Sequence, residues 1–249
     1  MRTGIVLLCL VVTAAANPLK LFRWRGDSLP DTITASRYMS AGVAWVDVED
    51  LNGRIDDFGL GEFSSYSLNL ALGWSVTRDR LISGGEWEGL FWRGNEIGGQ
   101  RSSFWASRLF FNTGVDLLGC EDLSFYPLVG IGAGLSALRA GPAQVSFTEA
   151  LVEPQQTMSI YQLSFLINAG AGFDYKLSSW RGYRNMLIGF RAGYVFDPAG
   201  STQWSRGISE VTDGPEPLLR GAYVRIVLGN SVRFSPKRIR RMRKRSEGR

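Results

Sequence analysis

Histidine is absent from this chain of 249 residues, and that limits the chemistry its other side chains could perform. Every triad or dyad whose base is histidine is excluded, and the commonest ligand of protein zinc sites is missing. Cys9 falls in an apolar N-terminal run, and Cys120 has neither a disulfide partner nor a base to activate it once that run is removed. We therefore expect no enzymatic activity, no cofactor and no metal site.

Three other groups of residues could suggest chemistry, but each has a simpler interpretation. Glu86 and Glu88 would share one face of a strand, where we expect them to pair with arginines rather than to act as acid and base. The run Gly130-x-Gly132-x-Gly134 is no nucleotide loop, because no helix follows it. One acidic stretch lacks the spacing of a calcium loop and is interpreted as solvated; it contains Glu49, Asp50, Asp56, Asp57 and Glu62.

Positive charge is concentrated at the C-terminus. The chain has a net charge of +5, of which 233–249 contribute +8 and Arg2 one more, so the body carries −4. A mildly acidic body is no platform for nucleic acid, and any electrostatic partner belongs to the tail. We expect the tail to bind anionic lipid headgroups, the alternative being a solvated end without a partner.

The N-terminus resembles a secretory signal peptide over 1–16. Arg2 precedes an apolar run from Ile5 to Val12, and Ala14-Ala15-Ala16 form a cleavage site before Asn17. The apolar run is much shorter than the ~20 residues that a spanning helix needs. The expected division is a signal peptide (1–16), an N-terminal periplasmic segment (17–36), a β-structured body (37–230) and a basic tail (231–249).

The body alternates between apolar and polar residues with a period of two. In the clearest run, from Tyr161 to Tyr175, apolar side chains occupy alternate positions and small or polar ones lie between them, with Leu166 as the exception. Such a run is one long strand with an apolar face and a polar face. The same pattern recurs in 66–76, 105–117, 125–135, 186–196 and 222–228, and more weakly in 37–48 and 81–92.

The connections between these strands alternate between long and short. Long connections cover 49–62, 93–102, 140–158 and 198–218, and short ones cover 78–80, 119–122 and 178–184. This rhythm is typical of a transmembrane β-barrel with long extracellular loops and short periplasmic turns. The fold expected is all-β, a single antiparallel transmembrane barrel of about eight strands.

Several glycine- and aromatic-rich stretches resemble the strands of small outer-membrane barrel proteins of Gram-negative bacteria: Tyr126–Leu135, Asn168–Tyr175 and Gly189–Tyr194. The resemblance covers most of 37–229 and concerns pattern rather than a diagnostic motif. It implies a location in the bacterial outer membrane, with membrane lipid as the partner. Many such proteins end on an aromatic residue of the last strand, whereas here a basic tail follows Phe234.

The polar strand faces would line the interior. A narrow lumen requires small residues and charges that neutralise one another, and the body has few lysines, unlike a water-exposed sheet. The candidate lumen charges are Glu86, Glu88, Arg108, Asp116, Asp174, Arg191 and Arg225. Aromatic residues near strand ends are expected to form two interfacial girdles: Trp74, Trp87, Trp92, Trp105, Tyr161, Tyr175 and Tyr194.

Two functions are compatible with these patterns. The first is a non-enzymatic outer-membrane barrel with a structural, surface-interaction or narrow-pore role. The second is a secreted soluble β-barrel or sandwich that holds its apolar face inward around an apolar ligand.

Overall fold

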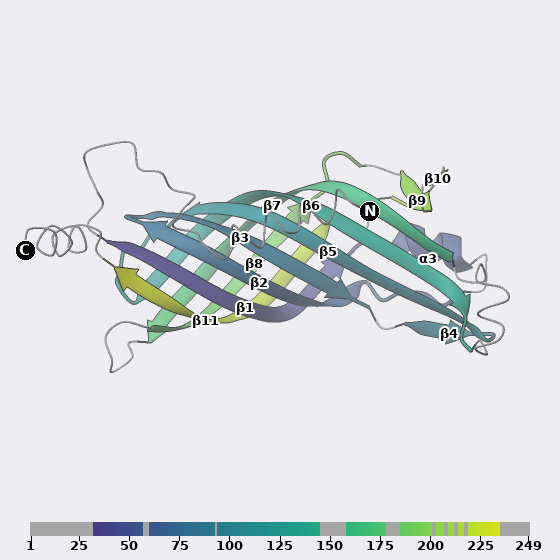
Figure 1. Ribbon diagram of the computed structural model, residues 1–249, viewed down its shortest axis with the longest axis horizontal. Coiled ribbons are helices and arrows are strands. Elements are labelled where there is room, and N and C mark those ends of the chain that lie inside the picture. Colours follow the sequence, from purple (N-terminus) through teal and green to yellow (C-terminus); the bar gives the residue numbers. More distant parts are fainter. Residues whose placement is uncertain are drawn as a thin grey trace, which may run out of the picture.

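The computed structural model describes residues 32–56, 60–92, 94–144, 158–177, 185–200, 203–206, 209–211, 214–216 and 219–234. Eight long strands form one barrel (Figure 1). They are β1 (Ile33–Val46), β2 (Tyr66–Arg78), β3 (Leu81–Phe91), β5 (Gln100–Val115), β6 (Leu123–Pro142), β7 (Met158–Leu177), β8 (Asn185–Phe196) and β11 (Gly221–Phe234). Each of the eight expected strands is confirmed, including the two with the weaker pattern.

Antiparallel pairing runs around the whole barrel without an open side. Neighbours follow the order β8, β11, β1, β2, β3, β5, β6, β7, and β7 pairs back onto β8 from Ile167↔Phe196 to Leu177↔Met186. The first and last barrel strands pair over their full length, from Ile33↔Phe234 to Val46↔Gly221. Closure leaves the middle of the barrel without a free sheet edge, as a membrane requires. We call the end that carries the connections after β1, β3, β6 and β8 the long-loop end. The opposite end, with the connections after β2, β5 and β7 and both termini of the barrel, is the short-turn end.

The barrel extends beyond its expected limits at both termini. β1 begins at Ile33, within the segment expected to precede the barrel, and β11 ends at Phe234, within the expected tail. The β1–β11 register explains the difference, because each added residue of one strand pairs with an added residue of the other. The expected signal peptide, and the tail from 235 onward, lie outside the described residues.

Apolar side chains cover the outside of the barrel. Leu70, Ile131, Leu163 and Ile226 are all exposed, Leu163 to 70%, although each is large and apolar. Between them, inward-facing residues such as Asn69, Arg108 and Arg225 are buried. A calyx with an apolar interior along its strands is therefore the wrong alternative, and the apolar-outside pattern is that of a barrel in lipid.

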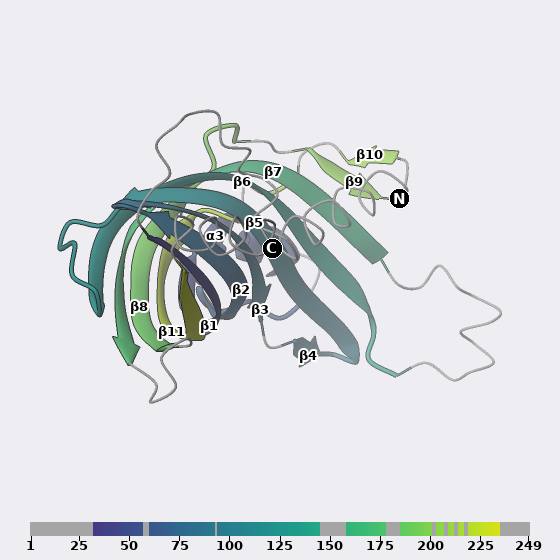
Figure 2. The ribbon, with the colours of Figure 1, turned by 60° about the vertical axis from the view of Figure 1, so that its left-hand side comes forward.

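The long-loop end carries the additional elements. Helix α3 (Glu49–Asp56) follows β1, strand β4 (Asn95–Ile97) pairs with the start of β5, and strands β9 (Trp204–Arg206) and β10 (Ser209–Val211) follow β8. β6 and β7, with 20 residues each, are the longest strands, and together with the start of β5 they extend past β3 and β8 toward this end (Figure 2). None of the described helices is long and apolar enough to cross a membrane.

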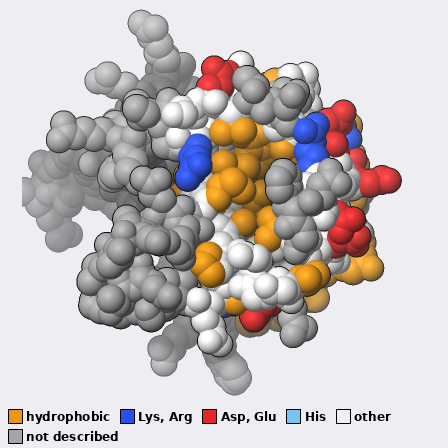
Figure 3. All heavy atoms as spheres, turned by 90° about the vertical axis from the view of Figure 1, so that its right-hand side faces the viewer, with side chains coloured by type: hydrophobic (Ala, Val, Ile, Leu, Met, Phe, Trp, Pro, Cys, Tyr) orange, Lys and Arg blue, Asp and Glu red, His pale blue; other side chains and the backbone are white. Residues whose placement is uncertain are grey.

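Apolar residues from α3 and the last long connection fill the mouth at the long-loop end. Leu51 and Ile55, one turn apart on α3, are buried together with Trp204 and Leu219. Seen from this end, hydrophobic side chains occupy the centre, with charged side chains around them (Figure 3). Trp92 belongs to this core, where its ring centroid lies 4.5 Å from that of Phe104. Its expected place in an interfacial girdle is therefore wrong.

Candidate functional site

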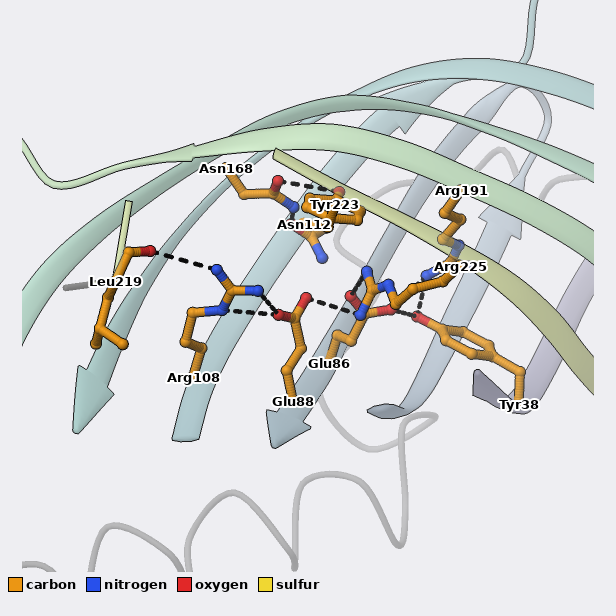
Figure 4. Close-up of polar contacts among 10 residues, drawn as sticks. All are labelled: Tyr38, Glu86, Glu88, Arg108, Asn112, Asn168, Arg191, Leu219, Tyr223 and Arg225. Carbon is orange, nitrogen blue, oxygen red and sulfur yellow. Dashed lines mark hydrogen bonds and ion pairs between the residues drawn. The ribbon is translucent and has the colours of Figure 1, made fainter. Parts of the chain in front are cut away.

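Buried charges from opposite sides of the barrel meet in the lumen (Figure 4). Glu88 on β3 and Arg108 on β5 are direct cross-strand partners, and Arg191 on β8 and Arg225 on β11 form another such pair. Two strands, β1 and β2, separate β11 from β3 around the barrel. Contacts between the two pairs must therefore cross the interior.

The carboxylates of Glu86 and Glu88 form ion pairs with the arginines of both pairs. Nη2 of Arg225 lies 2.6 Å from Glu86 Oε1, and Nη1 of the same guanidinium lies 2.8 Å from Glu88 Oε1. Nη2 of Arg108 lies 2.6 Å from Glu88 Oε2, and Nη1 of Arg191 lies 2.6 Å from Glu86 Oε2. The five side chains form one continuous lumen network of three arginines and two glutamates. A buried charge without a partner is costly, so the loss of any one of these side chains would destabilise the others.

Two tyrosines that are not among the predicted lumen residues also join the polar interior. Tyr38 donates its hydroxyl hydrogen to Glu86 Oε2 at 2.9 Å, and Tyr126 donates to Asp174 Oδ2 at 2.9 Å. The Arg191 guanidinium donates to the Tyr38 hydroxyl and lies 4.0 Å from the centre of its ring. Both tyrosine rings lie across glycines of the neighbouring strand, Tyr38 over Gly73 and Tyr126 over Gly172. The sequence signal that could have identified these two lumen tyrosines is a tyrosine on the polar face of one strand opposite a glycine of the next strand.

The remaining candidate lumen charges lie elsewhere. Asp174 is buried and bonded to Tyr126, and none of the described ion pairs includes it. Asp116 is buried at the short-turn end of β5, where its carboxylate accepts the backbone N–H of Leu118 at 3.2 Å. It therefore acts in a turn, at a distance from the network. A separate amide chain runs from Tyr223 to Asn168 at 3.1 Å and from Asn168 to Asn112 at 3.0 Å.

The lumen network also contacts the apolar core at the mouth. Nη1 of Arg108 donates to the backbone oxygen of Leu219 at 3.3 Å, and the Leu219 side chain packs against Leu166 and Gly134. Leu166, the exception to the alternation of β7, is fully buried here. This hydrogen bond and the inserted Leu219 side chain thus help to fix the last long connection to the barrel.

A small cavity lies on the short-turn side of the network. A cavity of about 20 Å³ lies toward the short-turn end, between Tyr38, Tyr126, Asn112 and Arg191. That volume holds about one water molecule. The described part of the lumen thus contains an apolar plug, a layer of ion pairs and a cavity of molecular-water size.

Two acidic residues of the first long connection pair with arginines. Asp47 binds Arg220 at 2.7 Å, and Asp50 lies 3.4 Å from Arg54 of the same helix. Asp50 also accepts the backbone N–H of Glu216 at 2.8 Å. Within the described ranges no group of three metal-ligating side chains was found. These contacts join the first and the last long connections to each other.

An eight-stranded closed antiparallel barrel with apolar side chains outside and paired charges inside is a barrel of the outer-membrane type. No family model matches the sequence, and no curated protein matches it.

Several solved outer-membrane barrels are similar in fold. Ail, the attachment invasion locus protein of Yersinia pestis, has 14% identity and a TM-score of 0.40 over 83% of this chain and 100% of its own. A major outer membrane protein from Thermus thermophilus has 11% identity and a TM-score of 0.46 over 81% and 99%. Neisserial surface protein A has 10% identity and a TM-score of 0.40 over 84% and 100%. At these values the similarity concerns the fold alone.

Proposed function

We propose that this protein is a non-enzymatic barrel of the bacterial outer membrane that does not conduct through its lumen. It would serve as a structural or surface-interaction protein, presenting its long-loop end outside the cell. The observation that carries the proposal is the layer of ion pairs between β3 and β11, since Arg225 bridges Glu86 and Glu88 across the interior. A permeating ion would have to displace this layer and the apolar plug above it.

The same contacts argue against a catalytic role for the two glutamates. Each carboxylate is held by two guanidinium groups, Glu86 by those of Arg191 and Arg225 and Glu88 by those of Arg108 and Arg225. A general acid or base needs an accessible atom and a proton that it can exchange with substrate. Two buried carboxylates, each paired with two guanidinium groups, offer neither.

Conductance in planar lipid bilayers tests the closed lumen. We expect the refolded full-length protein to show no unitary current steps. If steps appear, the variant Glu88→Gln identifies their origin. Removing this lumen charge should change the ion selectivity of a current that passes through the lumen, and it should not affect a current that passes elsewhere. Steps whose selectivity changes in this way would contradict the proposal.

Fractionation tests the location. We expect the protein to remain with outer membranes after carbonate or high-salt washing, because its exposed apolar face requires lipid. A protein released by these washes would instead be peripheral or soluble. Release would refute the membrane proposal without bearing on the lumen network.

The basic tail, 235–249, is proposed to bind anionic lipid headgroups, with about 1 kcal/mol for each basic residue near such a surface. Support comes from its charge, which the sequence concentrates after β11. Deletion of 235–249 should leave the barrel folded and reduce salt-sensitive binding to anionic vesicles. If the truncated protein bound anionic vesicles as strongly as the full-length protein, the tail would not be a lipid-binding segment.

A further inference from the structure

Two exposed arginines lie on the outer face of the barrel where β5 and β6 extend toward the long-loop end. Arg101 is near the start of β5 and Arg139 near the end of β6, and both are exposed. Arg101 pairs with Gly141 and Arg139 with Ser103, so the two arginines are diagonal neighbours on one face. Neither takes part in the ion pairs found among the described residues, although Glu96 is the cross-strand partner of Arg101.

Their height relative to the lipid follows from the strand geometry. On β6 the outer face is apolar from Phe125 through Val129, Ile131 and Leu135 to Ala137, and Arg139 comes next. Fourteen residues of antiparallel strand span about 48 Å, and a tilt of about 40° reduces this to about 36 Å along the membrane normal. The apolar band of such barrels is about 25 Å tall. Arg139 therefore lies beyond the hydrocarbon, at the level of the headgroups.

Aromatic residues mark the boundary directly below the arginines. Trp105 on β5 and Tyr161 on β7 flank Ala137 from both sides in the strand register. Ala137 is fully buried although it belongs to the outward face, because these two large side chains stand beside it. Tryptophan and tyrosine favour the membrane interface, where the ring meets hydrocarbon and the polar atom meets headgroups. The two arginines thus lie on the outer face, just beyond an interfacial pair of aromatic residues, and Nε of Arg101 lies near Gly94.

We propose that Arg101 and Arg139 bind a phosphate group of an anionic lipid in the leaflet at the long-loop end. A guanidinium offers paired N–H donors whose geometry matches phosphate oxygens, and two of them on one face can hold one phosphate between them. The apolar row below, with Leu135 and Leu163 exposed, would contact the acyl chains of the same lipid. The inference rests on the proposed membrane orientation and adds the chemistry of the lipid that surrounds this side of the barrel.

Lipid retention tests the proposal. Full-length protein would be reconstituted in phosphatidylcholine nanodiscs containing a small fraction of a bisphosphorylated glycolipid, extracted, and analysed for bound lipid by native mass spectrometry. We expect Arg101→Gln and Arg139→Gln each to lower glycolipid retention about fivefold. Arg206→Gln is the matched control: Arg206 is also exposed and at the long-loop end, but shares the β9 face that carries the buried Trp204.

The outcomes separate the possible failures. Equal retention by wild type and the two variants, or an equal loss with Arg206→Gln, overturns the site. Retention of dephosphorylated glycolipid as strong as that of the phosphorylated form also overturns it, because the guanidinium groups would then have no role. If wild type fails to insert into lipid at all, the membrane proposal fails, and that result is visible before any variant is compared.

Discussion

The side chain of Leu219 lies directly over Gly134, and a Cβ atom at position 134 would come within 2.3 Å of Leu219 Cδ1 and 2.8 Å of Leu166 Cδ1. Gly134 is on the inner face of β6, whereas Leu219 belongs to the last long connection. Because Gly134 has no side chain, Leu219 can pack over it. The last long connection therefore enters the barrel here, and its backbone accepts a hydrogen bond from Arg108.

Gly134→Val should displace Leu219 and destabilise the protein by about 1–3 kcal/mol through overpacking. The free energy of unfolding, from urea titrations of protein in lipid vesicles, measures this change. Gly53→Ala is the control, because nothing lies within 4 Å of a Cβ there and the residue is exposed on helix α3. We expect that change to stabilise slightly, since alanine favours a helix by about 0.5–1 kcal/mol over glycine. Equal effects at the two positions would show that Leu219 does not need the space over Gly134.

Glu86→Ala should destabilise the barrel by about 3–5 kcal/mol, because it leaves the buried Arg191 and Arg225 without a partner that both share. Arg191→Ala should cost less, about 1–3 kcal/mol, since Arg225 would still hold Glu86. Urea unfolding in vesicles measures both. For comparison, Glu121→Ala removes the exposed pair with Arg233 and should change stability by less than about 1 kcal/mol. Wild-type midpoints for both network variants would mean that the lumen charges are not coupled.

The contact between Asp47 and Arg220 should make the attachment of the last long connection dependent on pH. The hydrogen bond from Arg220 lowers the pKa of the Asp47 carboxyl from its ordinary value of 3.8, and the same bond raises the pKa of Arg220. A carboxyl with a depressed folded pKa stabilises the contact above its unfolded pKa, and the stabilisation is lost as pH falls through the folded value. The pair is about half exposed, so the effect should be about 1 kcal/mol or less.

Hydrogen exchange of the amides of Gly214, Glu216, Leu219 and Arg220, expressed as a protection factor relative to the intrinsic exchange rate at each pH, would reveal this loss as weaker protection at pH 3 than at pH 6. In Asp47→Asn these amides should be less protected already at pH 6, and their protection factors should depend less on pH. Asp50 and Glu216 are the other carboxylates in contact with this connection, so Asp50→Asn serves as the comparison. If Asp50→Asn removes the pH dependence and Asp47→Asn does not, the bond to Arg220 is not its source.

The strands could be predicted because the membrane imposes a simple rule on them. Lipid outside and a narrow polar lumen inside force strict alternation, so Leu163 and Phe165 stand out from Gln162 and Ser164 in the sequence itself. The same rule indicated which charges share the polar face. It could not indicate partners, because the contact between Glu86 and Arg225 joins residues 139 positions apart through the closure of the barrel.

The mouth of the barrel was not predicted, for a related reason. Outside the lipid, alternation no longer has to hold, and the acidic stretch after β1 appeared to be solvated. Leu51 and Ile55 are spaced as on one face of a helix, but two apolar residues in eight are a weak signal. Trp92 was assigned to a girdle because it lies near a strand end. Its burial depends on Phe104 of β5 and on the α3 core, which come from other parts of the sequence.

Ile167 and Asn168 provide the sharpest test of which face meets lipid. Ile167 is partly exposed on the outside of β7, whereas its neighbour Asn168 is buried and bonded to Asn112 and Tyr223. Ile167→Arg should cost about 2–4 kcal/mol if the position lies near the bilayer midplane, because a guanidinium would then face hydrocarbon. That cost should fall when the protein is folded in a thinner bilayer, since the arginine reaches the headgroups more easily. Asn168→Arg should disrupt the amide chain instead, with a cost independent of bilayer thickness. Folding yields and urea titrations in vesicles of short- and long-chain phosphatidylcholine distinguish the two responses, and the same thickness dependence for both variants would contradict the assignment of the faces.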